Sequence, residues 1–303
     1  MQANKTSRIQ EILLSNDKDI SLFIKREDEL HPFISGNKYR KLKYNLIEAK
    51  NQEKNTILSF GGAFSNHIAA IAYASEINGF NSVGVIRGEE LVDKIESNPT
   101  LKFAKSCGMK FFFVSRETYR NKNDQSFIKE LQNRFGDFYL VPEGGTNELA
   151  IKGCEEILKQ EDRNFNFICT SVGTGGTISG LVNASDTNQK ILGFPALKGD
   201  FLKEDIRKFA NQKNWELITD YHFGGYGKIK PELITFINSF KDKFGIPLDP
   251  IYTGKMMYGI FDLIGKDFFP KNSRILAIHT GGLQGIKGMN IRLKQKNLPL
   301  IKV

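Results

Sequence analysis

Short apolar runs alternate along the chain with longer stretches in which apolar residues recur every three or four positions. The short runs have the length of buried strands, and the longer stretches have the spacing of amphipathic helices. The expected strands are Thr56–Phe60, Ser82–Ile86, Lys110–Val114, Phe138–Val141, Phe165–Ser171, Ile191–Phe194, Glu216–Asp220 and Arg274–His279. The expected helices are His67–Asn78, one beginning near Pro99, Gln125–Phe135, Glu148–Lys159, one beginning at Ile178, Asp200–Gln212 and Pro231–Lys243. Strands and helices in this order form parallel sheets with helices on their faces, so the pattern predicts an α/β fold.

The expected strands fall into two groups along the chain. One group lies within residues 44–150 and the other within residues 151–303, which predicts two sheets with a cleft between them. The first 43 residues add a strand-like segment, Ser21–Lys25. Lys110–Val114 reads KFFFV and is expected to be a strand buried on both faces.

The charge of the chain is basic but evenly spread. Among 303 residues there are 43 Lys and Arg against 34 Asp and Glu, a formal charge of +9. Because the charges are interleaved and no nucleic-acid-binding motif is present, we expect a solvated basic surface and no nucleic-acid partner. The positive excess also favours attraction of an anionic cofactor or an amino-acid substrate.

The cysteines and the N-terminal segment indicate a cytoplasmic protein. Cys107, Cys154 and Cys169 are an odd number without a CxxC pair, which argues against a disulfide scaffold and a cysteine zinc site. The segment MQANKTSRIQEILL has no apolar signal core, and no apolar run is long enough to cross a bilayer. We therefore expect no membrane partner and no bound metal.

The segment Ser35–Lys41 (SGNKYRK) is the first with distinctive chemistry. Ser35 or Asn37 is expected to cap a helix whose first turn contains Lys38, with Lys41 about one turn further along the same side. The apolar face of this helix is expected at Leu42, Leu46 and Ala49. The helix dipole and burial would both lower the pKa of Lys38 and so favour the neutral amine that forms imines. A solvated surface lysine is the alternative.

Two glycine-rich turns each join an expected strand to an expected helix. In the first, SFGGAFSNH, two glycines allow a sharp turn, and Ser65 and Asn66 begin a helix whose free backbone amides can bind an anion. A plain helix cap with His67 satisfied in the core is the alternative. In Ser171–Thr177 (SVGTGGT), glycines bring the backbone close to a ligand and threonines add hydroxyls, which predicts a phosphate site. This turn lacks the Gly-Lys-Ser/Thr ending of a P-loop and the GxGxxG spacing.

Two late segments add hydroxyl groups. Asp249–Lys255 (DPIYTGK) leads into a helix, and His279–Gly282 (HTGG) follows the last expected strand. Ligands of open α/β sheets bind at the carboxyl ends of the strands, where both segments lie. Each segment alone indicates no more than a turn.

Together these motifs resemble the family of 1-aminocyclopropane-1-carboxylate deaminases and D-cysteine desulfhydrases, within the tryptophan-synthase-β-like group of pyridoxal-phosphate enzymes. The motifs KRED…HP..SGNK.RKL, FGG..SNH, GTGGT, YTGK and HTGG occur in the family's order and span almost the whole chain. The resemblance implies pyridoxal 5'-phosphate as cofactor, a small amino acid as substrate and a homodimer. It also implies two domains of the second pyridoxal-phosphate fold type, with residues 1–43 and 151–303 in the larger one, residues 44–150 in the smaller one and the active site between them.

The resemblance also implies roles for individual residues. Lys38 would carry the cofactor as a Schiff base and shuttle the α-proton of the substrate, while Asn66 would bond the ring hydroxyl oxygen. The residues implied for the phosphate are Lys41, Gly173, Thr174, Gly175, Gly176 and Thr177. The residues implied for the substrate are Ser65, Asn66 and His67 at its carboxylate, with Ser65, Tyr226 and Tyr252 as catalytic groups.

The choice of reaction depends on Thr253 and Thr280, which are implied to contact the cofactor. In the deaminases, the residue after the tyrosine that corresponds to Tyr252 is a Glu that meets the ring nitrogen, and the residue that corresponds to Thr280 is Leu. Hydroxyls at both positions favour elimination of a good leaving group, so D-cysteine is the expected substrate, giving pyruvate, sulfide and ammonia.

Other readings stay open beside this one. Since water completes the expected reaction, both the lyase and the hydrolase class are expected. The alternatives are 1-aminocyclopropane-1-carboxylate deamination, a pyridoxal-phosphate binder without activity, and a nucleotide-binding oxidoreductase, for which GxGxxG is missing.

Overall fold

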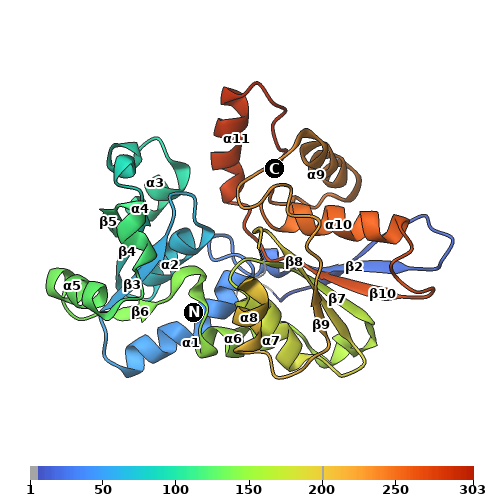
Figure 1. The fold of residues 1–303 in the computed structure, drawn as a ribbon, viewed down its shortest axis with the longest axis horizontal. Coiled ribbons are helices and arrows are strands. Elements are labelled where there is room, and N and C mark those ends of the chain that lie inside the picture. The colour runs from blue at the N-terminus through green and yellow to red at the C-terminus, as the bar shows by residue number, and fades with distance from the viewer. Residues whose placement is uncertain (1–5, 200) are drawn as a thin grey trace.

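The chain folds into two sheets of unequal size. The computed structural model describes residues 6–199 and 201–303, and the expected helix start at Asp200 lies outside them. Figure 1 shows the two sheets side by side, each with its own helices around it. The strands are mostly parallel and the helices flank them, which confirms the predicted α/β class.

The larger sheet has six strands in the order β1-β2-β10-β7-β8-β9. Its strands are β1 (Ile9–Ile12), β2 (Ser21–Lys25), β7 (Phe167–Val172), β8 (Lys190–Pro195), β9 (Trp215–Leu217) and β10 (Arg274–Ile278). The β1–β2 pair is antiparallel and the other described pairs are parallel. Alternate residues of β10 enter opposite cores, with Ile275 and Ala277 in one and Leu276 and Ile278 in the other. This central strand is therefore buried on both faces, as parallel strands usually are.

Within the described residues, five helices belong to the six-stranded sheet. They are α7 (Gly176–Ala184), α8 (Phe201–Arg207), α9 (Pro231–Phe244), α10 (Thr253–Gly265) and α11 (Gly285–Gln295). Residues of α9, α10 and α11 line the core on one face, and residues of α7 and α8 line the core on the other.

The smaller sheet has four parallel strands in the order β5-β4-β3-β6. Its strands are β3 (Thr56–Gly61), β4 (Asn81–Arg87), β5 (Lys110–Val114) and β6 (Tyr139–Val141). Its helices are α2 (Asn66–Ile77), α3 (Pro99–Ser106), α4 (Arg116–Arg120) and α5 (Gln125–Phe135). Two core clusters cover its faces, one with α2 and α3 and the other with α5.

Two helices connect the sheets. α1 (Asn37–Asn51) packs on α6 (Glu148–Glu155), and α6 packs on α7 of the six-stranded sheet. The apolar face predicted for α1 at Leu42, Leu46 and Ala49 is buried in the core of the four-stranded sheet, which confirms the prediction. The first residues of α1 contact turns of the six-stranded sheet instead. The lysine segment is therefore held from both sides.

Several details differ from the sequence expectations. Lys110–Val114 is an edge strand whose first four residues are exposed or half-buried, so the prediction of burial on both faces is wrong. The strand expected at Glu216–Asp220 lies at Trp215–Leu217, and the helix expected to reach Lys159 ends at Glu155. β1 and α11 were not expected. The division into domains of residues 44–150 and of residues 1–43 with 151–303 stays a prediction.

Candidate active site

The lysine segment lies directly against the turn after β10. Gly36 begins α1 with a positive φ of 62°, and a side chain there would place its Cβ 2.0 Å from the carbonyl oxygen of Thr280. The Asn37 amide Nδ2 donates to Thr177 Oγ1 at 2.8 Å, and Ser35 Oγ donates to the Asp28 carbonyl at 3.3 Å. Neither side chain caps the helix, so the predicted cap at Ser35 or Asn37 is wrong. Glycine is required here because the two backbones nearly touch.

Lys38 has the properties of an amine that reacts at neutral pH. Burial, followed by the positive charge of Lys41, lowers the pKa of Lys38 to about 7. The Nζ atom donates to Asn37 Oδ1 at 3.1 Å. A lysine held near neutrality in this way is a nucleophile toward carbonyl groups.

Lys41 joins the lysine helix to the glycine-rich turn. Its side chain is buried, and Nζ donates to the Gly144 carbonyl at 3.0 Å and to Thr146 Oγ1 at 3.1 Å. Thr174 Oγ1 lies 3.5 Å from the same Nζ and 2.6 Å from Thr146 Oγ1. Burial also lowers the pKa of Lys41.

The glycine-rich turn fits a phosphate group. Gly175 adopts a φ of 84° and precedes α7, so the first amides of this helix are free to bind an anion. A side chain on Gly176 would place its Cβ 3.1 Å from Lys41 Nζ, and one on Gly173 would place it 3.2 Å from the Tyr252 ring. The glycines therefore let the backbone of the turn pack closely against Lys41 and Tyr252, where any other residue would clash.

The start of α2 is built as an amide site with a side-chain amide beside it. Ser65 caps the helix by accepting from Ile68 N at 3.3 Å. Asn66 Oδ1 accepts a hydrogen bond from Gln284 Nε2, and Thr100 Oγ1 donates to Gln284 Oε1 at 3.1 Å. Gln284 was not expected, because nothing local in the sequence distinguishes it.

The His67 side chain points into the core. Its Nε2 lies 2.8 Å from Ser59 Oγ, which donates to the Val141 carbonyl at 2.8 Å. Burial, then the charges of Lys38 and Lys41, keep the pKa of His67 well below its ordinary value. His67 is therefore a buried, neutral histidine at the start of α2.

Tyr252 and Thr253 are fixed by Asp249 at the start of α10. The buried Asp249 carboxylate accepts from Tyr252 N at 2.8 Å, from Thr253 N at 2.8 Å and from Thr253 Oγ1 at 2.7 Å. Asp249 N in turn donates to Thr253 Oγ1 at 2.9 Å. The Thr253 hydroxyl is thus bonded to Asp249. The Thr280 hydroxyl pairs with another hydroxyl instead, at 3.0 Å from Ser171 Oγ. Thr280 and Ser171 are the hydroxyl pair placed between the ends of β7 and β10.

Tyr226 completes the aromatic part of the site. Its ring lies 6.2 Å from the Tyr252 ring in an edge-to-face arrangement. Tyr226 is 48% exposed, and desolvation of its hydroxyl raises its pKa. Burial together with the Tyr226 hydroxyl raises the pKa of Tyr252 well above its ordinary value. Both phenols are therefore protonated at neutral pH and are hydrogen-bond donors.

A polar group at the end of β4 faces the same region and was not expected. Arg87 Nη2 would be 3.6 Å from a Cβ on Gly62, and the Arg87 guanidinium lies 5.5 Å from the Tyr119 ring centre. Tyr119 Oη donates to Glu143 Oε1 at 2.8 Å. The positive charge of Arg87 lowers the pKa of Tyr226, and the negative charge of Glu143 raises it.

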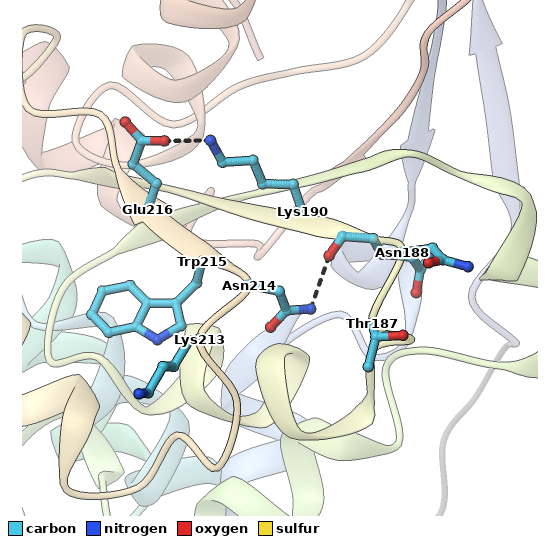
Figure 2. A pocket seen from close by; sticks show the side chains of 8 residues that line it. Thr187, Asn188, Lys190, Lys213, Asn214, Trp215 and Glu216 are labelled. Carbon is cyan, nitrogen blue, oxygen red and sulfur yellow. Dashed lines mark hydrogen bonds and ion pairs between the residues drawn. The ribbon is translucent and has the colours of Figure 1, made fainter.

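The hollow drawn in Figure 2 is separate from this site. Its volume is about 510 Å³, and an ion pair between Lys190 and Glu216 crosses it. It lies where β8 and β9 begin, whereas ligands of parallel sheets bind where strands end. None of the sequence-predicted site residues lines it.

Within residues 6–199 and 201–303, no group of three or more His, Cys, Asp and Glu side chains could hold a metal ion. No helix in the same part of the chain is long and apolar enough to cross a membrane.

Two mostly parallel sheets, a lysine of lowered pKa and a glycine-rich turn at a helix start are typical of an α/β enzyme with a phosphorylated carbonyl cofactor. Comparison with known proteins agrees. A family model described as pyridoxal-phosphate dependent enzyme matches residues 5–281. The chain therefore belongs to the pyridoxal-phosphate dependent enzymes, and its cofactor is pyridoxal phosphate.

Individual relatives cover most of the chain. A mitochondrial bifunctional D-cysteine desulfhydrase/1-aminocyclopropane-1-carboxylate deaminase of Arabidopsis thaliana is 30% identical in an alignment 296 positions long, which covers 88% of this chain and 73% of that protein. A D-cysteine desulfhydrase of Serratia proteamaculans is 29% identical in an alignment 290 positions long, which covers 86% of each chain. The crystal structure of an ACC deaminase homologue has a TM-score of 0.85 and 27% identity, covering 97% of this chain and 95% of that one.

These relatives confirm the resemblance seen in the sequence and correct one expectation. The hydrolase class is wrong, because the names of the relatives are those of lyases. In a desulfhydrase the carbon–sulfur bond breaks by elimination, and water enters only after that bond has broken.

Proposed function

We propose that the protein catalyses α,β-elimination on a small amino acid, with D-cysteine as the preferred substrate. The observation that carries this choice is the hydroxyl pair of Ser171 and Thr280, 3.0 Å apart between the ends of β7 and β10. The nearby carboxylate of Asp249 is engaged by backbone amides and Thr253. A cofactor ring whose nitrogen faced neutral hydroxyls would withdraw electrons less strongly than one whose nitrogen faced a carboxylate. Weaker withdrawal suits a substrate whose leaving group departs readily.

The cofactor fits the residues around it. Lys41 and the amides of Gly173–Thr177 would hold its phosphate, Lys38 would anchor it, and Asn66 would bond its ring hydroxyl. When bound, pyridoxal phosphate supplies the electron sink for the bond-breaking steps. The protein supplies orientation and proton transfer.

The remaining residues handle the substrate and its protons. The backbone amides at Ser65, Asn66 and His67 would bind its carboxylate at the positive end of α2. The neutral Lys38 Nζ would accept the α-proton, and Tyr226 and Tyr252 would donate hydrogen bonds near the leaving group. The Cβ–S bond breaks, sulfur leaves as hydrogen sulfide, and water converts 2-aminoacrylate to pyruvate and ammonia.

A side-by-side assay tests the substrate choice. Purified holoenzyme is given D-cysteine, L-cysteine and 1-aminocyclopropane-1-carboxylate, and pyruvate, sulfide and 2-oxobutanoate are measured. We expect pyruvate and sulfide in equal amounts from D-cysteine, and little 2-oxobutanoate. Efficient turnover of the cyclopropane amino acid with none of D-cysteine would instead favour the deaminase, an activity named in the bifunctional Arabidopsis relative.

Two coarser features complete the proposal. We expect a homodimer, as the sequence resemblance implies, and light scattering after size-exclusion chromatography tests it. A cytoplasmic location is proposed from the reduced cysteines, all three of which are buried and unpaired. Fractionation of cells that express the tagged protein tests the location.

A further inference from the structure

A buried lysine holds the loop that carries Tyr226. Lys255 lies in the first turn of α10 and is 2% exposed. Its Nζ donates to the His222 carbonyl at 2.8 Å and to the Gly225 carbonyl at 2.9 Å. Among the described residues, no carboxylate oxygen lies within ion-pair distance of this Nζ. A buried ammonium is costly unless it is well bonded, so the two hydrogen bonds offset that cost. A lysine at this buried position therefore points to a role for the two bonds.

The loop needs an external support. Phe223, Gly224, Gly225 and Gly227 all have positive φ, between 54° and 111°. Within the loop, Gly225 N donates to the His222 carbonyl at 3.0 Å and Lys228 N donates to the Gly225 carbonyl at 3.2 Å. Glycine-rich backbone of this kind has many accessible conformations and little cost for leaving any one of them. Lys255 bonds the two carbonyls that close these turns and thereby selects one conformation.

The same helical turn carries Tyr252 and the lysine that holds the loop of Tyr226. Tyr252 precedes Lys255 by three residues, so the two side chains emerge on the same side of α10. Lys255 fixes the loop, the loop carries Tyr226, and the Tyr226 ring lies 6.2 Å from the Tyr252 ring. The distance between the two phenols therefore depends on Lys255. Among the described residues, this lysine forms no hydrogen bond with either tyrosine side chain.

We infer that Lys255 is a positioning residue that sets the Tyr226 phenol against Tyr252 at the substrate. This inference rests on the proposed function, in which Tyr226 faces the substrate. This role differs from the roles proposed for Lys38 and Lys41. Lys38 bonds Asn37 and Lys41 reaches the turn after β7, whereas Lys255 bonds two carbonyl oxygens of the Tyr226 loop.

A double-mutant cycle tests the inference. Lys255→Met keeps most of the apolar stem and removes the ammonium, Tyr226→Phe removes the phenol oxygen, and Lys228→Met on the exposed part of the same loop is the matched control. We expect Lys255→Met to lower kcat about tenfold with KM changed less than about twofold, and to change kcat less than about twofold when Tyr226 is already Phe. Lys228→Met should leave kcat unchanged. An equal loss in both backgrounds would overturn the inference.

A second measurement does not depend on turnover. Hydrogen exchange of the backbone amides of residues 222–228 is followed in cofactor-free protein, where Lys255→Met should speed exchange in this loop about tenfold and leave β7 and β10 unchanged. Unchanged exchange would show that Lys255 does not hold the loop. If the loop loosens but Tyr226→Phe leaves turnover intact, the role of Tyr226 in the proposed function is wrong and the support of the loop stands. Lys255→Gln, with a shorter stem, replaces the Met variant if that variant does not fold.

Discussion

The lowered pKa of Lys38 gives a quantitative prediction for the cofactor-free protein. With a pKa of about 7, about half of the Lys38 amines are neutral at pH 7. An ordinary lysine with a pKa near 10.5 has about one neutral amine in 3,000 at that pH. Lys38 should therefore react with a carbonyl compound roughly a thousandfold more readily than a surface lysine near pH 7, because only the neutral amine attacks.

The assay uses pyridoxal, which lacks the phosphate, so that the glycine-rich turn does not contribute to binding. The rate of covalent adduct formation is measured against pH, the adduct is reduced with borohydride, and the labelled peptide is identified. We expect a half-maximal rate near pH 7 and the label on Lys38. Lys38→Ala is the control and should lose this fast phase.

Replacing Lys41 separates the two causes of the shift. Burial is the larger cause and stays in Lys41→Met, whereas the nearby positive charge is removed, so the pKa of Lys38 should rise and the half-maximal pH with it. The reasoning is refuted if the wild type reaches half-maximal rate only near pH 10, or if the label lies on another peptide.

The same shift predicts how the stability of the cofactor-free protein depends on pH. Between pH 7 and about 10.5 the unfolded chain carries a proton on Lys38 that the folded chain has lost. Because stability rises with pH wherever the unfolded state binds more protons, this group should add at most about 1.4 kcal/mol per pH unit in that window. Denaturant unfolding of the wild type and of Lys38→Met across this range measures the difference.

Two further predictions concern the turn and the substrate. Gly175→Val should weaken cofactor retention, measured by dialysis and titration, more than Lys41→Met does. The valine strains a φ of 84° and places a Cβ 3.0 Å from Ile206 Cγ1, whereas Lys41 contributes one charge-assisted contact of about 1.5–3 kcal/mol. Gly79→Val, at a φ of 76° in open space, is the control for strain alone, and equal retention in wild type and Gly175→Val would remove the turn from the site. Thr253→Glu with Thr280→Leu should lower elimination from D-cysteine, measured as pyruvate release, and unchanged elimination would show that these positions do not control the reaction.

Local signals in the sequence predict most of the elements. The alternation of strands and helices predicted the α/β class, and the apolar face of α1 is buried as expected. Local patterns misjudged features that depend on the neighbours. The edge position of β5 follows from which strand lies beside it, and the cap of α1 is a glycine because the turn after β10 leaves no room for a Cβ at Gly36.

The polar contacts of the site explain why the rest could not be predicted. His67 follows Ser65 and Asn66 in the chain, but its side chain contacts Ser59, eight residues earlier on the preceding strand. Gln284 reaches Asn66 from 218 residues away, and no motif marks it. Sequence spacing reports neighbours on one helix or turn, whereas these bonds depend on how the two sheets are packed.

The most telling contacts join segments that lie far apart in the chain. Asn37 bonds Thr177 across 140 residues, and Lys41 reaches Thr174 across 133 residues. Both bonds connect a helix whose core belongs to the four-stranded sheet with the turn after β7 of the six-stranded sheet. A change in the packing of the two sheets would therefore move Lys38 relative to the turn after β7, even with every motif intact. The lowered pKa of Lys38 therefore depends on the packing of the two sheets, because burial is its largest cause.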